Sequence, residues 1–177
     1  MSIANENDRE IRKRELEEEF ADLLGLPWSG RRYPGCYGIV QKYAQTRLGR
    51  SLKDFSGLYT SFMDDAVQEE DGVWIARPEW GELLDMSILQ KSDLLLFKVY
   101  DTVMGDEEKF KQRAPNHGGV YLGDGFLLHQ LWQEKSSIVD MRRGVYKRYQ
   151  TCCVGTVSYT HLRAHETVLD LVCRLLL

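Results

Sequence analysis

A strand-turn-strand pattern over residues 116–129 constrains the fold more than any other stretch of the chain. Two short apolar runs flank a Gly-Asp-Gly turn at residues 123–125, and Asp-Gly between apolar runs is a strong hairpin signal. His117 opens the first run and His129 closes the second. Because the open ends of an antiparallel pair lie side by side, we expect two neighbouring imidazoles, which are candidates for a base and its orienting partner.

Length and composition indicate one soluble globular domain, which we place at residues 1–157. The chain has 177 residues, 43% of them apolar and 28% charged, and its net charge of −4 gives no reason to expect nucleic acid as a partner. No run approaches the ~18 apolar residues that a membrane-spanning helix requires. Residues 5–19 are mostly charged, which does not fit a signal peptide, so we expect synthesis in the cytoplasm.

Helices are expected in the N-terminal half and strands in the C-terminal half. Apolar spacing predicts a helix that begins near Asn7 and ends at Gly25. A second helix is expected from Cys36 to Leu48, with Gly49 after its end. Beside the hairpin, strands are expected over residues 94–100, 137–140 and 149–157.

Cys36 follows a loop rich in Gly and Pro, and it therefore lies at or near the first turn of a helix. Unpaired N–H groups and the helix dipole favour a thiolate there. A lone cysteine is more often a small buried hydrophobe. However, such a cysteine, a downstream histidine that opens a strand and a polar residue on the next strand form the layout of a papain-like thiol enzyme.

No metal or cofactor is expected. His161 and His165 have the i, i+4 spacing of metal ligands, and Cys152 and Cys153 are near in sequence. The chain lacks both the HExxH glutamate and the CxxC spacing that would support such a site. The segment over residues 158–177 also resembles translated sequencing-adapter sequence, so we expect it to be a non-native or disordered tail.

Three blocks of the chain resemble the signatures of the NlpC family of cell-wall cysteine peptidases. They are residues 36–40 (CYGIV), 91–97 (KSDLLLF) and 117–129, and the resemblance extends over roughly residues 16–157. The histidine block is the most specific of the three. An aromatic residue after the cysteine, together with the stretch LGRSLKDF at residues 48–55, is similar to the phage-tail branch of the family.

The resemblance implies an α+β, papain-like fold in which N-terminal helices pack on an antiparallel sheet. It makes Cys36 the nucleophile, His117 the general base and acid, and His129 the polar third member. It assigns Trp28 and Tyr37 to the oxyanion and substrate cleft. The implied reaction is hydrolysis of amide bonds in the peptide stems of peptidoglycan, without a metal or a cofactor.

The resemblance to the phage branch further implies a virion-tail protein that acts on the bacterial cell wall, with phage tail-tip proteins as partners. Two other classes remain open. One is a different Cys/His acyl-transfer enzyme on the same scaffold, such as an amidase, a transglutaminase-like enzyme or a thioesterase. The other is a non-catalytic tail assembly protein that keeps the fold.

Three positions depart from the family pattern. Gly35 stands where an aspartate is usual before the cysteine, and Ser92 stands where a glycine is usual. Trp28 follows Pro27 where family members have a tyrosine near the oxyanion. The indole N–H can donate in place of the phenol, and the backbone N–H of Cys36 is expected to be the main oxyanion donor.

Overall fold

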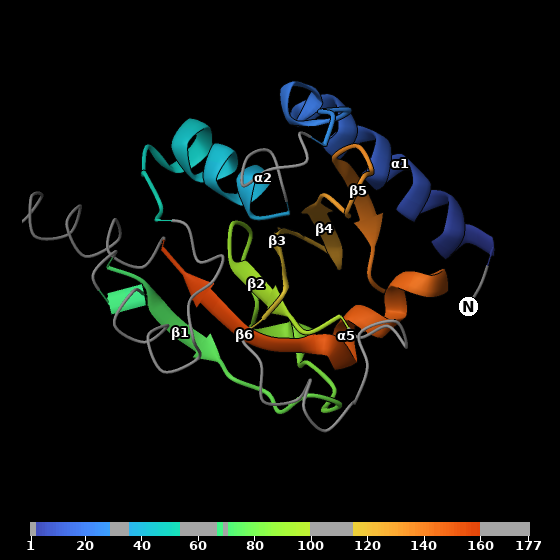
Figure 1. Ribbon diagram of the computed structural model, residues 1–177. Coiled ribbons are helices and arrows are strands. Elements are labelled where there is room, and N and C mark those ends of the chain that lie inside the picture. The colour runs from blue at the N-terminus through green and yellow to red at the C-terminus, as the bar shows by residue number, and fades with distance from the viewer. Residues whose placement is uncertain (1–2, 29–35, 54–66, 69–70, 100–114, 160–177) are drawn as a thin grey trace, which may run out of the picture.

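The computed structural model describes residues 3–28, 36–53, 67–68, 71–99 and 115–159. Within these ranges the strands form one antiparallel sheet in the order β1-β6-β2-β3-β4-β5 (Figure 1). The strands are β1 (Val73–Ala76), β2 (Leu94–Phe97), β3 (His117–Gly123), β4 (Phe126–His129), β5 (Ser137–Asp140) and β6 (Cys153–Ser158). The α-helices are α1 (Ile3–Glu19), α2 (Cys36–Tyr43) and α5 (Tyr149–Cys152).

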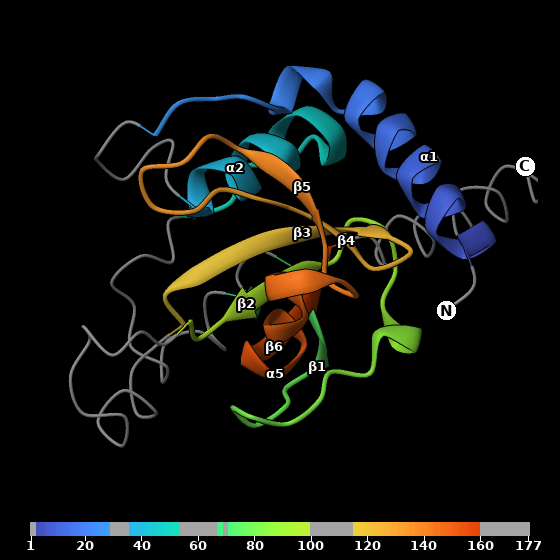
Figure 2. The ribbon, with the colours of Figure 1, turned by 90° about the vertical axis from the view of Figure 1, so that its right-hand side faces the viewer.

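Two apolar cores lie on opposite faces of this sheet, because successive side chains of a strand point to opposite sides. Helices α1 and α2 cover one face, with α2 against β3 and β4 and α1 against β5 (Figure 2). Their core includes Leu16, Ile39 and Val120, whereas Leu127 and Tyr149 belong to the core of the other face. This architecture confirms the expected α+β arrangement of N-terminal helices packed on an antiparallel sheet, with Cys36 as the first residue of its helix.

The hairpin that dominates the sequence forms as predicted. Asp124 and Gly125, the two turn residues, have φ values of 55° and 86°. Positive φ at both central positions is the signature of the type I′ turn, whose twist matches that of the flanking strands. The pairing of β3 with β4 sets Gly119 opposite His129. Because His117 lies two residues before Gly119, both histidines share one face of the sheet.

Three predicted elements have other bounds in the structure. Helix α1 runs from Ile3 to Glu19 rather than from near Asn7 to Gly25, because residues 3–6 contain neither Gly nor Pro and continue it at its start, and a separate 3₁₀ turn over Ala21–Leu23 follows its end. The strand expected over residues 94–100 is β2, which ends at Phe97. The expected strand over residues 149–157 is divided, since its first four residues form α5 and only β6 is extended. The helix expected from Cys36 to Leu48 is confirmed, with its last turn as a π-helix and Gly49 left-handed after it.

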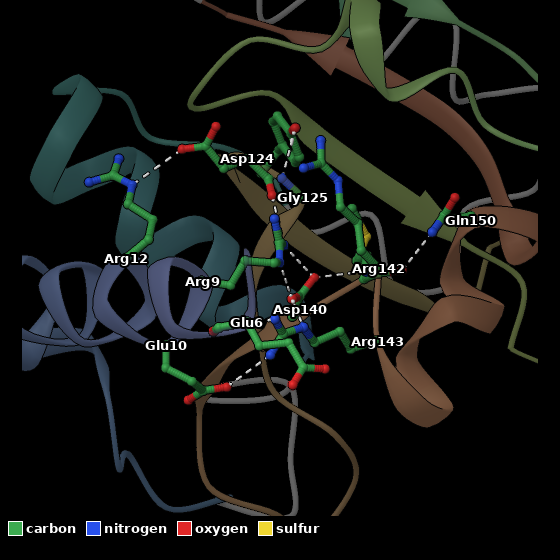
Figure 3. Close-up of polar contacts among 12 residues, drawn as sticks. Glu6, Arg9, Glu10, Arg12, Asp124, Gly125, Asp140, Arg142, Arg143 and Gln150 are labelled. Atoms are coloured by element: carbon green, nitrogen blue, oxygen red, sulfur yellow. Dashed lines mark hydrogen bonds and ion pairs between the residues drawn. The ribbon is translucent and has the colours of Figure 1, made fainter. Parts of the chain in front are cut away.

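Helix α1 is attached to the sheet by one buried arginine (Figure 3). Arg9 donates two hydrogen bonds to the Asp140 carboxylate, at 2.7 and 2.6 Å, and a third to the backbone carbonyl of Asp124 at 2.9 Å. Its guanidinium also lies 4.8 Å from the centroid of the Phe126 ring. One side chain of α1 therefore joins the hairpin turn to the end of β5.

Replacing Arg9 by alanine is expected to lower the free energy of unfolding by about 3 kcal/mol, because it leaves the Asp140 carboxylate part-buried without its main partner. Arg143, 3.5 Å from Asp140, compensates for part of this loss. Urea denaturation measures the effect. Arg12→Ala is the matched control, since Arg12 makes exposed ion pairs and its loss is expected to cost less than about 1 kcal/mol. Equal effects of the two substitutions would contradict this account of α1.

Strand β6 ends at Ser158, and the following residue, Tyr159, is buried in the same core as Leu16, Ile39 and Val120. Of the segment 158–177, expected to be a non-native or disordered tail, residues 160–177 lie outside the described residues, so its character stays a prediction. No helix within the described ranges is long and apolar enough to cross a membrane.

Candidate functional site

The two hairpin histidines contact each other directly. Nε2 of His117 lies 3.1 Å from Nδ1 of His129, and the two rings are nearly perpendicular, at 83°. Both side chains are buried, with exposed fractions of 7% and 1%. The contact follows from the strand register, which brings the two residues diagonally together on one face of the β3–β4 pair. The predicted proximity of the imidazoles is confirmed.

Burial makes both imidazoles hard to protonate. Loss of solvent lowers the pKa of His117 from its ordinary 6.5 to about 3, and the adjoining His129 contributes in the same direction. Burial likewise lowers the pKa of His129 to about 4. Near neutral pH the pair is therefore uncharged. One of the two ring nitrogens in contact then donates a hydrogen bond, and the other accepts it.

Acid is expected to destabilise the fold through this pair. In the unfolded chain both histidines bind protons below about pH 6.5, whereas in the folded chain their lowered pKa values keep them neutral. The free energy of unfolding should thus fall as pH drops from 6.5 toward 5, by about 2 kcal/mol for each histidine.

Urea denaturation of the wild type and of a His117→Gln, His129→Gln double variant across this pH range measures the effect. The double variant is expected to show a flatter dependence, because the carboxylates that titrate at lower pH are common to both proteins. Equal slopes for the two proteins would contradict the proposed neutral pair.

Cys36 lies beside the start of β3. Its Sγ is 3.8 Å from the backbone carbonyl oxygen of Asn116, the residue that precedes His117. Asn116 is itself fixed to the segment after β2. Its side-chain oxygen accepts a hydrogen bond from the Val99 N–H at 2.8 Å, and its side-chain nitrogen donates to the Val99 carbonyl at 2.9 Å. Its backbone N–H donates to Phe97 at 3.0 Å. The contact between Cys36 and Asn116 thus places the start of α2 next to the start of β3.

The predicted cleft residues have different surroundings. Tyr37 is 8% exposed and packs in the core under β3, where a Cβ on Gly118 would lie 3.6 Å from its ring. Trp28 is half-buried, and its Nε1 has no hydrogen-bond acceptor within the described part of the chain. A buried donor without a partner is costly, so the indole N–H would gain from a hydrogen-bond acceptor. The cleft roles of both residues stay predictions.

The segment that leads to Trp28 is held by hydrogen bonds from the region after β4. Gln130, the residue after His129, donates to the Leu26 carbonyl at 2.9 Å. Ser136 accepts from the Leu26 N–H at 2.9 Å and donates to the Leu23 carbonyl at 2.7 Å. Trp28 therefore lies two residues after Leu26, whose backbone N–H and carbonyl are both hydrogen-bonded to side chains that follow β4.

Two of the three departures from the family pattern can be placed. Ser92 has φ of 84°, a conformation that favours glycine, so a glycine is the unstrained residue at this position. Its hydroxyl forms a buried 2.7 Å hydrogen bond with Tyr43 Oη, which ties the end of α2 to the entry of β2. Trp28 follows the segment that Gln130 and Ser136 hold. Gly35 lies outside the described residues.

Three aromatic residues around the histidines were not predicted as part of the site. Phe97 pairs with His117 across β2 and β3, with ring centroids 5.7 Å apart. Tyr149 stacks on His117, and Tyr146 meets His129 edge-on at 5.8 Å. The apolar run that contains Phe97 predicted a buried strand. No local pattern, however, links residues 146–149 to a histidine far away in the chain. Only the fold brings them together.

No group of three His, Cys, Asp or Glu side chains that could hold a metal ion occurs among residues 3–28, 36–53, 67–68, 71–99 and 115–159. His161 and His165, the pair with metal-ligand spacing, lie outside these ranges.

The chain matches no model of a known protein family and no curated protein. Among solved structures it is similar to an NlpC/P60 family protein from Bacillus cereus ATCC 10987, with 20% identity and a TM-score of 0.41 over 71% of the chain. It is also similar to NlpC1 from Trichomonas vaginalis, with 18% identity and a TM-score of 0.44 over 75% of the chain. It covers 31% and 38% of these two proteins, or about a third of their length.

Proposed function

We propose that the protein is a thiol hydrolase in which Cys36 is the nucleophile, His117 the general base and acid, and His129 its orienting partner. The observation that carries this proposal is the buried 3.1 Å contact between His117 and His129. Cys36 Sγ lies 3.8 Å from the backbone carbonyl oxygen of Asn116, the residue before His117. A thiol, an imidazole and a polar group that orients the imidazole are the three components such chemistry requires. We place this activity in a single domain over residues 1–157.

The hydrogen bond defines the role of each ring nitrogen. His117 Nε2 is engaged with His129, so Nδ1 is the nitrogen left to exchange a proton with the cysteine. For Nδ1 to be unprotonated, Nε2 must carry the hydrogen and donate it to His129 Nδ1. His129 thereby selects the tautomer of His117 that can act as a base. The carboxamide of asparagine can replace it in this role, because its oxygen also accepts a hydrogen bond.

The reaction then runs in two half-reactions. Cys36 Sγ attacks the carbonyl carbon of an amide while its proton passes to His117 Nδ1. When the tetrahedral intermediate collapses, the C–N bond breaks, His117 protonates the leaving amine, and a thioester to Cys36 remains. A water molecule then loses a proton to His117 and attacks the thioester. Collapse returns that proton to the Cys36 sulfur and releases the carboxylic acid.

The oxyanion of each tetrahedral intermediate requires preorganised donors. The backbone N–H of Cys36 is proposed as the first, because it belongs to the nucleophile itself at the start of α2 and follows the oxyanion role that the family resemblance implies. The Nε1–H of Trp28 is proposed as the second, and its lack of an acceptor within the described residues supports this assignment. An indole thus takes the place of the phenol that the family pattern has at this position.

The proposed substrate is an amide bond in a peptidoglycan stem peptide. This assignment is based on the resemblance of residues 36–40, 91–97 and 117–129 to the NlpC signatures. The further resemblance of residues 48–55 to the phage-tail branch supports a role in a virion tail that opens the bacterial wall locally, with tail-tip proteins as neighbours.

Incubation of the purified protein with a panel of defined muropeptides, followed by mass analysis of the products, tests the function. The expected result is a pair of fragments whose summed mass exceeds that of the substrate by one water, from a single amide bond. Turnover of acyl esters without any muropeptide cleavage would instead indicate an acyl-transfer enzyme of another specificity. No turnover of either class would favour a non-catalytic assembly protein and contradict the proposal.

A further inference from the structure

The His117–His129 pair is enclosed by a cluster of aromatic rings centred on Tyr149. The Tyr149 ring lies 5.7 Å from His117 at an interplanar angle of 28°, which is a stacked geometry. It also meets His129 edge-on, at 5.5 Å and 78°. Phe97 lies 5.1 Å from Tyr149 and 5.7 Å from His117, so the three rings are in mutual contact. Tyr149 is the residue that contacts both histidines and Phe97.

The short helix that carries Tyr149 is fixed by hydrogen bonds to other segments. A four-residue helix has little stability of its own. The carbonyl groups of the next three residues accept hydrogen bonds from backbone N–H groups far away in sequence, at 2.8 to 2.9 Å. The pairs are Gln150 with Leu84, Thr151 with Gly81, and Cys152 with Lys98. Tyr149 is therefore anchored by the backbone, and it is only 2% exposed.

The phenol of Tyr149 stays protonated near neutral pH. Burial raises the pKa of Tyr149 to about 12, with an opposing effect from Arg148. The charges of Cys152 and Cys36 are among the smaller contributions in the raising direction.

We propose that Tyr149 is a positioning residue of this site, whose ring holds the His117 imidazole in the plane required by its hydrogen bond to His129 and keeps water away from that bond. The inference rests on the proposed thiol-hydrolase function. A 3.1 Å contact between two rings at 83° allows little rotation of either imidazole. A flat ring stacked on one of them restricts that rotation, and an aliphatic side chain does not.

Tyr149→Phe and Tyr149→Leu separate the ring from the rest of the side chain. Tyr149→Phe keeps the stack and is expected to keep kcat within about threefold of the wild type. Tyr149→Leu is expected to lower kcat by about 30-fold with little change in KM, because misplacing a catalytic group by about 1 Å can cost about 100-fold. Phe126→Leu is the matched control, since Phe126 is also buried but packs at the distant hairpin turn, and kcat should not change.

Titration of the histidine imidazoles by NMR supplies a readout that does not depend on activity. In Tyr149→Leu the His117 pKa is expected to rise toward its ordinary value as water reaches the ring, and the acid limb of the kcat profile should move to higher pH. Tyr149→Phe should keep the wild-type titration. If Tyr149→Leu does not fold, Tyr149→Met, whose longer and unbranched side chain adapts better to the space without an aromatic face, provides the same comparison.

The proposal is overturned if a folded Tyr149→Leu or Tyr149→Met variant keeps both the wild-type histidine titration and the wild-type kcat. It is also overturned if Tyr149→Phe loses as much as Tyr149→Leu, since the hydroxyl would then be the essential group. If the wild type has no hydrolase activity, the proposed function fails, and the histidine titrations of the variants still decide whether Tyr149 controls the pair.

Discussion

Replacing Cys36 by alanine is expected to reduce muropeptide cleavage at least about 10⁴-fold, to the limit of detection. The thioester cannot form without the sulfur, and removal of a nucleophile from a catalytic triad leaves only the contribution of binding and oxyanion donors. The substitution should leave the fold intact, because Cys36 is half-buried at a helix start and contributes little apolar area. Initial rates from product mass, together with a thermal melt, measure both effects.

Cys152→Ala is the matched control, since Cys152 is also a half-buried cysteine that forms no disulfide, and it has no proposed role in the reaction. Its cleavage rate is expected to stay within about twofold of the wild type. If Cys36→Ala keeps more than a tenth of the wild-type rate while folding normally, Cys36 is not the nucleophile.

Replacing His117 by glutamine is expected to lower kcat by about 10³-fold or more, because general acid–base catalysis typically contributes 10² to 10⁴ and the cysteine also loses its proton acceptor. Glutamine is close to histidine in size and polar, so the buried contact with His129 can be partly kept. Comparison of kcat with KM separates loss of chemistry from loss of binding, and only kcat should change strongly.

His129 variants test whether catalysis by His117 depends on which of its two ring nitrogens carries the hydrogen. His129→Asn keeps an oxygen that can accept the hydrogen of His117 Nε2, and it is expected to keep more activity than His129→Leu by at least about tenfold. Leucine has no acceptor and leaves the His117 N–H buried without a partner. Equal activity of the two variants would show that His129 does not orient His117. If His117→Gln keeps the wild-type activity, His117 is not the general base.

Local patterns predicted the parts of the site that depend on neighbours in sequence. The Asp124-Gly125 turn specifies the hairpin, and strand pairing then brings His117 and His129 together, as the 3.1 Å contact confirms. The same reasoning placed Cys36 at the start of a helix. In each case the relevant information lies within a few residues or in a short register.

Tertiary packing decided the parts that the sequence pattern missed. Residues 149–152 have the composition of a strand, but their backbone bonds the segment at residues 81–84 and forms α5 instead. Their helical form places Tyr149 on His117, a contact that no local periodicity encodes. The same holds for Arg9, whose partner Asp140 is distant in the chain.

Covalent labelling with an electrophile tests most directly whether Cys36 is the nucleophile of a site that includes His117. The probe is a stem-peptide fragment that ends in a chloromethyl ketone, with intact-protein mass and peptide mapping as the readout. The predicted result is one label per molecule, located on Cys36, with labelling slowed strongly by His117→Gln and unaffected by Cys152→Ala. Labelling of Cys152 in preference to Cys36, or a rate on Cys36 that is independent of His117, would contradict the account.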